Sequence, residues 1–285
     1  MANLKEIRNR ISSVSSTMQI TSAMKMVSAA KLKKAQDAIT AMRPYADKLT
    51  ELLQNLSATL DADSGSKFAD QREVKNVLIV AITSNRGLCG AFNSNIIKQA
   101  NHLANSYEGK KVSVVAIGKK ANDALSKEYE ILANESTVFD DLTFDNVAQI
   151  AELLMQKFEE GSVDKIELVY NKFKNAATQI VTTEQFLPIV PSADATDANQ
   201  DYIFEPSKAE IVETLIPKSL KTQLFKAIRD SFASEHGARM TAMHKATDNA
   251  TELRDQLKLT YNKARQAAIT NEILEIVGGA EALNN

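Results

Sequence analysis

Residues 218–277 read KSLKTQLFKAIRDSFASEHGARMTAMHKATDNATELRDQLKLTYNKARQAAITNEILEIV. The stretch contains no proline and a single glycine, Gly237, and the pair Gly278-Gly279 follows it. Glycine adopts the left-handed conformation of a helix C-cap without a steric penalty, so this pair predicts the end of a helix. At 1.5 Å per residue, one helix over this stretch would be about 90 Å long. Such a length predicts a coiled coil or a shaft.

The expected seam of this helix consists mostly of small residues. At the 3.5-residue spacing of a left-handed coiled coil, the seam contains Met243, Ala246, Ala250, Leu253, Leu257, Thr260, Ala264 and Ala267. Small side chains let two helices approach closely, but they bury little area at about 25 cal/mol per Å2. The helix is therefore expected to need a partner along its length and a sleeve of other chains around it.

A second long helix is predicted over residues 3–60. Its stripe has heptad spacing and contains Ile7, Ile11, Val14, Met18, Thr21, Met24 and Val27, and then Leu32, Ala35, Ile39 and Met42. The stripe resumes at Leu49, Leu52, Leu53 and Leu56. Pro44 lies between these two parts and is expected to kink or interrupt the helix.

The middle of the chain has a different period. Short apolar runs of the kind that form strands buried on both faces occupy residues 75–83 and 111–118, and residues 163–173 and 177–187 are predicted as two more strands. Helical patterns occupy residues 91–107, 119–129 and 144–160, the last with Val147, Ile150, Ala151, Leu154 and Phe158 on one face. This alternation predicts a layered α/β domain with a largely parallel sheet.

These segments define the expected architecture. A Rossmann-like α/β domain, residues 75–206, is inserted between two coiled-coil helices, residues 1–60 and 207–285. Polar breaks flank the inserted domain at 61–67 and 188–200. Because the chain leaves this domain and returns to it, the terminal helices are expected to pair antiparallel.

Charge is unevenly distributed along the chain. Residues 1–60 carry nine Lys/Arg and four Asp/Glu, whereas residues 61–210 carry 15 and 23. A basic N-terminal helix indicates either an acidic partner surface or a solvated helix face. Its basic residues are too sparse for a DNA-gripping region and no aromatic stacking platform accompanies them, so no nucleic-acid partner is expected.

The composition also bears on location. Cys89 is the one cysteine, so an internal disulfide is impossible and a reducing compartment is expected. No run approaches 18 apolar residues, and the N-terminus lacks the apolar region of a secretory signal.

The turn after the first predicted strand is the one candidate for a phosphate-binding loop. It offers Gly87-Leu-Cys-Gly90, which lacks both the G-x-G-x-x-G fingerprint and the Lys-Ser/Thr of a P-loop. A tight turn that packs the next helix onto the sheet is the expectation, without direct nucleotide binding.

Catalytic and metal sites are not expected either. Cys89 at a helix start would need a base. His236 and His244 are expected on the long helix, away from the α/β domain, and His102 falls inside the following helix. The three histidines lack metal-ligand spacing. Neither a cofactor nor a catalytic residue is therefore predicted.

Three blocks of residues resemble the gamma subunit of F-type ATP synthases. The first is Ile7-Arg8, Ile11, Val14, Thr17, Ile20-Thr21, Ala23-Met24, Met26-Val27 and Lys31. The second is SEHGARM at 234–240, ATDNA at 246–250 and YNKARQA at 261–267, continuing through Ile269-Thr270 and Glu272 to 275–280. The third is the turn 84–93, which is similar to the family pattern S-D-R-G-L-C-G-x-x-N.

The chain departs from the family pattern at three positions. Asn85 stands where the family usually has Asp, and Ala91 where Gly is common, so the role of this turn is open. Gln19 replaces a common lysine, so an ion pair at that position cannot be assumed.

The resemblance implies a rotary shaft that performs no chemistry itself. Its terminal helices would form an antiparallel coiled coil inside a ring of three alpha and three beta subunits. The α/β domain would carry the epsilon subunit and sit on the membrane c-ring. One copy per complex would lie at the cytoplasmic face of the bacterial inner membrane, as a peripheral protein.

The resemblance also suggests contact residues. Met24, Arg265, Gln266 and Thr270 are expected to contact beta, with packing or solvent exposure as the alternative. Asp201, Tyr202 and Glu205 are expected in the foot that meets the c-ring, with a plain linker as the alternative.

Two other classes of function remain open. The α/β domain could be a nucleotide-binding enzyme with helical arms, which tight nucleotide binding by the isolated chain would indicate. The chain could also be a coiled-coil scaffold, which self-association in place of a hetero-oligomeric ATPase would indicate.

Overall fold

The computed structural model describes residues 4–58, 67–189 and 208–283. The chain divides into two compact units, one of Met1–Ser28 with Met240–Asn285 and the other of Ala29–Arg239. We name them the helix-pair unit and the α/β unit. The described part of the helix-pair unit is entirely helical, and the α/β unit contains the sheet.

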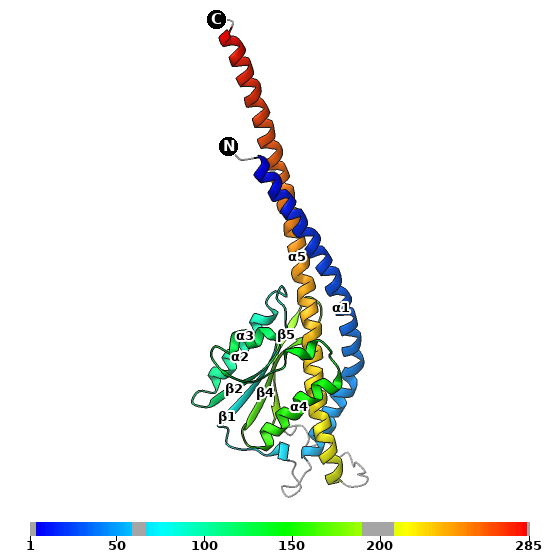
Figure 1. Ribbon diagram of the computed structural model, residues 1–285. Coiled ribbons are helices and arrows are strands. Elements are labelled where there is room, and N and C mark those ends of the chain that lie inside the picture. Colours follow the sequence, from blue (N-terminus) through cyan, green and yellow to red (C-terminus); the bar gives the residue numbers. More distant parts are fainter. Residues whose placement is uncertain (1–3, 59–66, 190–207, 284–285) are drawn as a thin grey trace. The chain divides into compact units, whose positions relative to one another are not determined.

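Two long helices contribute residues to both units. Helix α1 spans Leu4–Ala58 and helix α5 spans Lys208–Leu283 (Figure 1). Helix α1 continues through Pro44, so the interruption expected there does not occur.

Helix α5 begins at Lys208 and continues through Gly278-Gly279, so the helix end expected at this glycine pair does not occur. Neither of these glycines has the positive φ of a C-cap. A glycine inside a helix costs only about 1 kcal/mol relative to alanine, so it weakens a helix without ending it.

In the helix-pair unit, α1 and α5 run antiparallel. Arg8 Nη2 donates a hydrogen bond to the Tyr261 hydroxyl at 2.7 Å, and the hydroxyl oxygens of Thr21 and Thr247 lie 2.8 Å apart. A residue further along α1 therefore meets a residue earlier along α5. This confirms the expected direction of pairing within the unit.

After Ala250, the seam of α5 in this unit keeps Leu257 and Ala264 as expected but differs by one residue at every second seam position. Three expected seam residues are exposed, Leu253, Thr260 and Ala267, and three neighbours are partly buried in their place, Arg254, Tyr261 and Ala268. Arg254 Nη1 lies 3.5 Å from the Met18 sulfur, and Tyr261 accepts the bond from Arg8. Long polar side chains cover apolar surface with their stems, which a search for small apolar residues does not detect.

The α1 side of this seam follows the prediction for most of its length. The expected Ile7, Ile11, Val14, Met18 and Thr21 are buried or partly buried. Val27 is 57% exposed, however, and Ser28 is buried instead. The prediction for Val27 was therefore wrong.

The sheet of the α/β unit has five strands in the order β3-β2-β1-β4-β5. They are β1 (Asn76–Ile82), β2 (Lys111–Ile117), β3 (Glu130–Asn134), β4 (Lys165–Phe173) and β5 (Gln179–Leu187). The first four in this order are parallel, and β5 pairs antiparallel with β4. Four of the strands were predicted. The edge strand β3 was not, because it is short and lacks a buried apolar run.

Helices cover both faces of this sheet (Figure 1). Helices α2 (Phe92–Ser106) and α3 (Lys119–Leu125) pack with Val77, Ile79 and Ala81 of β1. Helix α4 (Phe144–Glu159) and the α/β-unit part of α5 share the core that contains Leu78, Val80 and Ile82. Successive β1 side chains thus face opposite layers, as the period of a strand requires.

Gly118 shows how closely two strand ends approach each other. It follows β2 with φ +111°, and a Cβ atom at this position would lie 2.3 Å from the Thr83 carbonyl oxygen. Only a residue without a side chain fits there, because both the backbone conformation and the space exclude Cβ.

We expect Gly118→Ala to lower the free energy of unfolding by about 3 kcal/mol, because backbone strain and the clash with Thr83 add together. Urea unfolding followed by circular dichroism measures this loss. Gly109→Ala is the matched control, since Gly109 also has positive φ, +80°, but has nothing within 4 Å of its added Cβ. An equal loss in both variants would contradict a role for the close approach.

Candidate functional site

The C-terminal part of α5 extends past the described start of α1 within the helix-pair unit. Arg8 already meets Tyr261, and α1 begins at Leu4. Residues 269–280 of α5 are all exposed. No described residue covers this segment, which we name the α5 tip.

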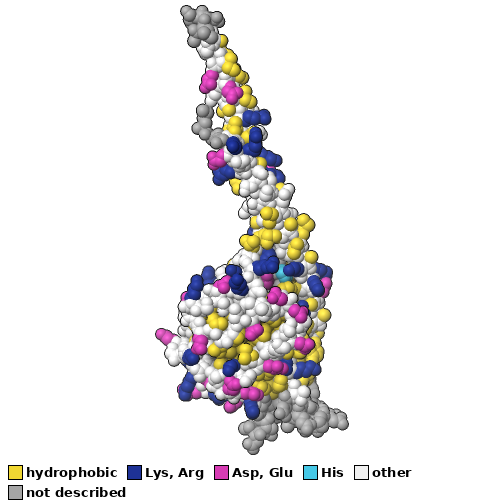
Figure 2. Space-filling model, in the orientation of Figure 1, with side chains coloured by type: hydrophobic (Ala, Val, Ile, Leu, Met, Phe, Trp, Pro, Cys, Tyr) yellow, Lys and Arg dark blue, Asp and Glu magenta, His cyan; other side chains and the backbone are white. Residues whose placement is uncertain are grey.

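The α5 tip carries large apolar side chains (Figure 2). Those between 47% and 72% exposed are Ile269, Ile273, Leu274, Ile276 and Val277. An isolated helix of this length is marginal in water, and contiguous apolar surface marks an interaction site. The arrangement therefore fits a helix that is held by another protein.

A second apolar surface lies on α1 in the same unit. Ile20, Met26 and Val27 are between 57% and 65% exposed. Lys25 between them is half-buried, and Arg8 and Arg10 are exposed further towards the start of the helix. The two helices thus present different chemistry to their surroundings.

The predicted beta contacts lie at or near these surfaces. Arg265 and Gln266 are exposed directly before the α5 tip, and Thr270 lies within it. The Thr270 hydroxyl donates to the Gln266 carbonyl oxygen at 3.0 Å, a bond inside the helix. Met24 on α1 is half-buried. The predicted foot residues Asp201, Tyr202 and Glu205 lie outside the described residues.

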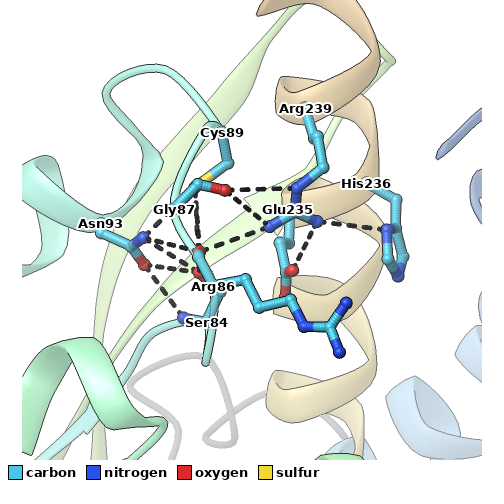
Figure 3. A network of polar contacts seen from close by, with 8 residues as sticks. All are labelled: Ser84, Arg86, Gly87, Cys89, Asn93, Glu235, His236 and Arg239. Atoms are coloured by element: carbon cyan, nitrogen blue, oxygen red, sulfur yellow. Dashed lines mark hydrogen bonds and ion pairs between the residues drawn. The ribbon is translucent and has the colours of Figure 1, made fainter. Parts of the chain in front are cut away.

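The turn after β1 forms a closed hydrogen-bonded network in the α/β unit (Figure 3). Ser84 donates its backbone N–H to Asn93 Oδ1 at 2.9 Å and its hydroxyl to the Arg86 carbonyl oxygen at 2.6 Å. Asn93 Nδ2 donates to the sulfur of the buried Cys89 at 3.2 Å. The polar side chains of this turn are thus used to hold the turn itself.

Arg239 attaches this turn to helix α5. Its guanidinium donates to the carbonyl oxygens of Arg86 at 3.4 Å and Gly87 at 3.3 Å, and to Glu235 Oε1 at 2.6 Å (Figure 3). Burial raises the pKa of the Glu235 carboxyl, and the Arg239 charge opposes that rise. The sequence did not single out Glu235 or Arg239, because a charged pair four residues apart is usual on any exposed helix.

Asn85 uses chemistry that an aspartate lacks. Its side-chain amide donates to the Ser136 carbonyl oxygen at 2.8 Å, and its Oδ1 accepts from the Lys119 backbone N–H at 2.9 Å. A carboxylate could accept the second bond but could not donate the first. The departure from the family pattern at this position therefore joins the turn to the start of α3 and to the short 3-10 helix Ser136–Phe139.

The prediction that His236 lies away from the α/β domain was wrong. His236 is 5% exposed in the α/β unit, and its ring centroid lies 4.5 Å from that of Phe232. Burial lowers its pKa to about 4, with Arg239 and Lys31 acting in the same direction. Burial also raises the pKa of the Cys89 thiol. The buried imidazole is therefore neutral and the buried thiol protonated, which describes packed side chains rather than an activated nucleophile.

The described residues contain no group of three or more His, Cys, Asp or Glu side chains placed to hold a metal ion. Within the same ranges, no helix has both the length and the hydropathy that crossing a bilayer requires.

The chain forms two long helices with an α/β unit inserted between them in the sequence, and the helices leave apolar surface open. These features define a class of protein that works by binding within a larger assembly. A family model described as ATP synthase matches residues 3–283, and the chain belongs to this family, as a gamma chain. It is 78% identical over 284 residues to the ATP synthase gamma chain of Flavobacterium psychrophilum, covering 99% of each chain. It is 76% identical to that of Flavobacterium johnsoniae over the full length of both.

Solved structures agree with this membership. A chain of the Tetrahymena thermophila mitochondrial ATP synthase central stalk and c-ring is 26% identical with a TM-score of 0.59, covering 80% of this chain and 99% of that one. A chain of the Euglena gracilis mitochondrial ATP synthase is 24% identical with a TM-score of 0.69, covering 98% and 94%, and shows the same fold. The protein is a non-catalytic, central-stalk subunit of an F-type ATP synthase.

The buried neutral His236 predicts a pH dependence of stability. Its pKa is about 4 in the folded chain and about 6.5 when unfolded, so the unfolded state binds more protons below pH 6.5. The stability present above pH 6.5 is therefore lost as the pH falls towards 4. We expect wild type to lose about 2 kcal/mol more than His236→Gln between pH 7 and pH 5, measured by urea unfolding. Equal losses in the two chains would show that His236 titrates normally in the folded state.

Proposed function

We propose that this chain is the central rotor shaft of an F-type ATP synthase. It couples ion-driven rotation of the membrane c-ring to ATP synthesis or hydrolysis at the catalytic sites of an alpha3beta3 ring. The observation that carries the proposal is the α5 tip, a helix end whose apolar side chains no described residue covers. A ring of surrounding subunits would supply the missing cover.

The shaft acts through asymmetry. Moving one nucleotide site between populations of 1:99 and 99:1 requires about 5.5 kcal/mol of differential contact energy. The helix-pair unit has apolar surfaces on both helices and exposed basic residues on α1, so its outer faces differ from one another. As such a pair turns, each beta subunit meets one of its different surfaces after another, which a symmetric shaft cannot provide.

Particular contacts follow from this proposal. Arg265, Gln266 and Thr270 of α5 and Met24 of α1 contact beta subunits. Their exposure or partial exposure beside uncovered apolar surface supports this role. Arg265 is the strongest of the four, because its planar guanidinium can donate paired hydrogen bonds to a carboxylate.

The remaining partners are assigned to the inserted domain. We assign the epsilon subunit and the c-ring to the domain of residues 75–206, with Asp201, Tyr202 and Glu205 in the foot. Residues 1–60 and 207–285 are the coiled-coil domains. One copy serves each complex, as a peripheral protein at the cytoplasmic face of the bacterial inner membrane. The Tetrahymena thermophila structure, which contains a central stalk and a c-ring, supports the assignment of the c-ring as a partner.

The subunit itself is proposed to bind no nucleotide and to need no cofactor. The turn after β1 supports this, because the Ser84 backbone N–H, a donor of the kind that a phosphate needs, already bonds to Asn93 Oδ1. Nucleotide binding by the isolated chain would favour an enzyme instead. Self-association without ring subunits would favour a scaffold.

Removing the α5 tip tests the proposal directly. We expect a chain ending at Ala268 to stay folded, because the described hydrogen bond of the tip lies inside its own helix, but to bind alpha3beta3 more than about tenfold more weakly. The loss of even one buried large apolar side chain costs about 1.5–3 kcal/mol. Co-expression with alpha and beta subunits, sizing and an ATPase assay measure the change, with thermal melting as the control for folding. Full assembly and turnover by the shortened chain would remove the tip from the interface.

We also expect Arg265→Ala and Gln266→Ala to lower coupled ATP turnover by about five- to tenfold each, the usual size of an interface anchor effect. Both side chains are exposed, so neither change should alter the melting temperature of the chain. Lys245→Ala, an exposed position on the same helix, is the matched control and should turn over normally. Turnover at the wild-type level in both variants would exclude these residues as beta contacts.

A further inference from the structure

Three elements of the α/β unit meet at one buried ion pair. Arg43 of α1 reaches Asp230 of α5, with Nη2 and Oδ1 2.7 Å apart. The same nitrogen donates to the Phe173 carbonyl oxygen at the end of β4, also at 2.7 Å. The Phe173 backbone N–H in turn donates to Asp230 Oδ1 at 3.3 Å. Each of the three residues thus bonds to the other two.

Because this triangle is buried, the loss of either charged side chain is expected to destabilise it. The Asp230 side chain is 0% exposed, and that of Arg43 is 34% exposed. Among the described residues, Asp230 Oδ2 has no hydrogen-bond partner, so Arg43 alone supplies the compensating charge. Removing one partner from such a pair leaves a buried uncompensated charge, whereas neutralising both does not.

Nearby contacts hold α5 close to the same strands. The Ser234 hydroxyl donates to the Asn171 carbonyl oxygen of β4 at 3.0 Å. A Cβ atom on Gly237 would lie 3.1 Å from the Ala176 carbonyl oxygen in the β4–β5 turn. These contacts join α5 to the sheet, but they do not include α1. The bridge from α1 to β4 rests on Arg43.

A second ion pair between the same helices provides a contrast. Lys226 of α5 reaches Asp47 of α1 at 2.6 Å, one helical turn beyond Arg43. The Asp47 side chain is 62% exposed. The described bond of this pair runs from the Lys226 ammonium to Asp47 Oδ1 and involves no strand. It therefore links helix to helix on the surface, and such pairs contribute little.

We propose that Arg43 is a positioning residue that ties α1 to α5 and to the end of β4, so that the sheet cannot twist about these two helices within the α/β unit when load is applied. This inference rests on the proposed shaft function, because only a loaded shaft needs torsional stiffness. A helix packed on a sheet by apolar side chains alone can slide, since those contacts are not directional. The triangle of directional bonds fixes both helices to one strand end and resists that sliding.

The experiment uses the assembled alpha3beta3 ring with the full chain as its shaft. A bead attached through Lys110→Cys on the α/β unit reports the angular fluctuations of the shaft at each ATP-waiting pause. The principal variant is Arg43→Met with Asp230→Asn, which removes both charges while the asparagine still accepts from Phe173. Arg43→Met alone is the second variant, and Asp47→Asn is the matched control that breaks only the surface pair.

We expect the double variant to melt close to wild type and to hydrolyse ATP at the wild-type rate without load. Its torsional stiffness, obtained from the width of the angular distribution, should fall about twofold. Arg43→Met alone should soften the shaft in the same way and also lower the melting temperature. Asp47→Asn should leave the stiffness unchanged.

Wild-type stiffness in the double variant would overturn the inference, and so would equal softening in Asp47→Asn, since any pair between the helices would then suffice. A wild-type chain that fails to turn inside the ring overturns the proposed function and the inference together. A wild-type chain that turns, with unaltered stiffness in the variants, overturns the inference alone.

Discussion

The chain enters the inserted α/β domain from α1 and leaves it through α5, so these two helices can pair only antiparallel, and this constraint governs the structure. In the α/β unit the cost of ordering α5 is offset by large side chains such as Leu220, Leu224 and Ile228, which pack on the sheet. In the helix-pair unit the seam contains small residues such as Ala250 and polar ones such as Thr21. Small side chains let these two helices approach closely, but the pair buries little apolar area. Its outer surface must then find other partners.

Much of the fold was readable because the deciding residues repeat at a fixed period. The runs that became β1, β2 and β4 are continuous and apolar, and strands covered on both faces produce such runs. Strand β3 has alternating exposed and half-buried residues, so its assignment depends on its neighbour β2 rather than on its own composition. The one-residue differences in the α5 seam had a similar origin, because Arg254 and Tyr261 gain their places from partners on α1.

The candidate surfaces were only partly readable. Resemblance pointed to Arg265, Gln266 and Thr270, and the structure leaves all three exposed. The apolar α5 tip could not be recognised from its sequence, since the same residues would be ordinary core in a helix with a longer partner. The attachment of the β1 turn through Arg239 joins residues more than 150 positions apart. Contacts between residues so far apart in the sequence are set by packing, and no local pattern in one sequence encodes them.

The open apolar tip of α5 also has a consequence for how the protein is made. A newly synthesised copy exposes five large apolar side chains at one helix end until other chains enclose them. Apolar surface of that kind promotes association with whatever is near, including other copies. Surplus subunit is therefore a liability to the cell, and its synthesis is best matched to that of the chains that enclose it. The apolar tip that serves the assembled complex thereby limits how much unassembled subunit a cell can tolerate.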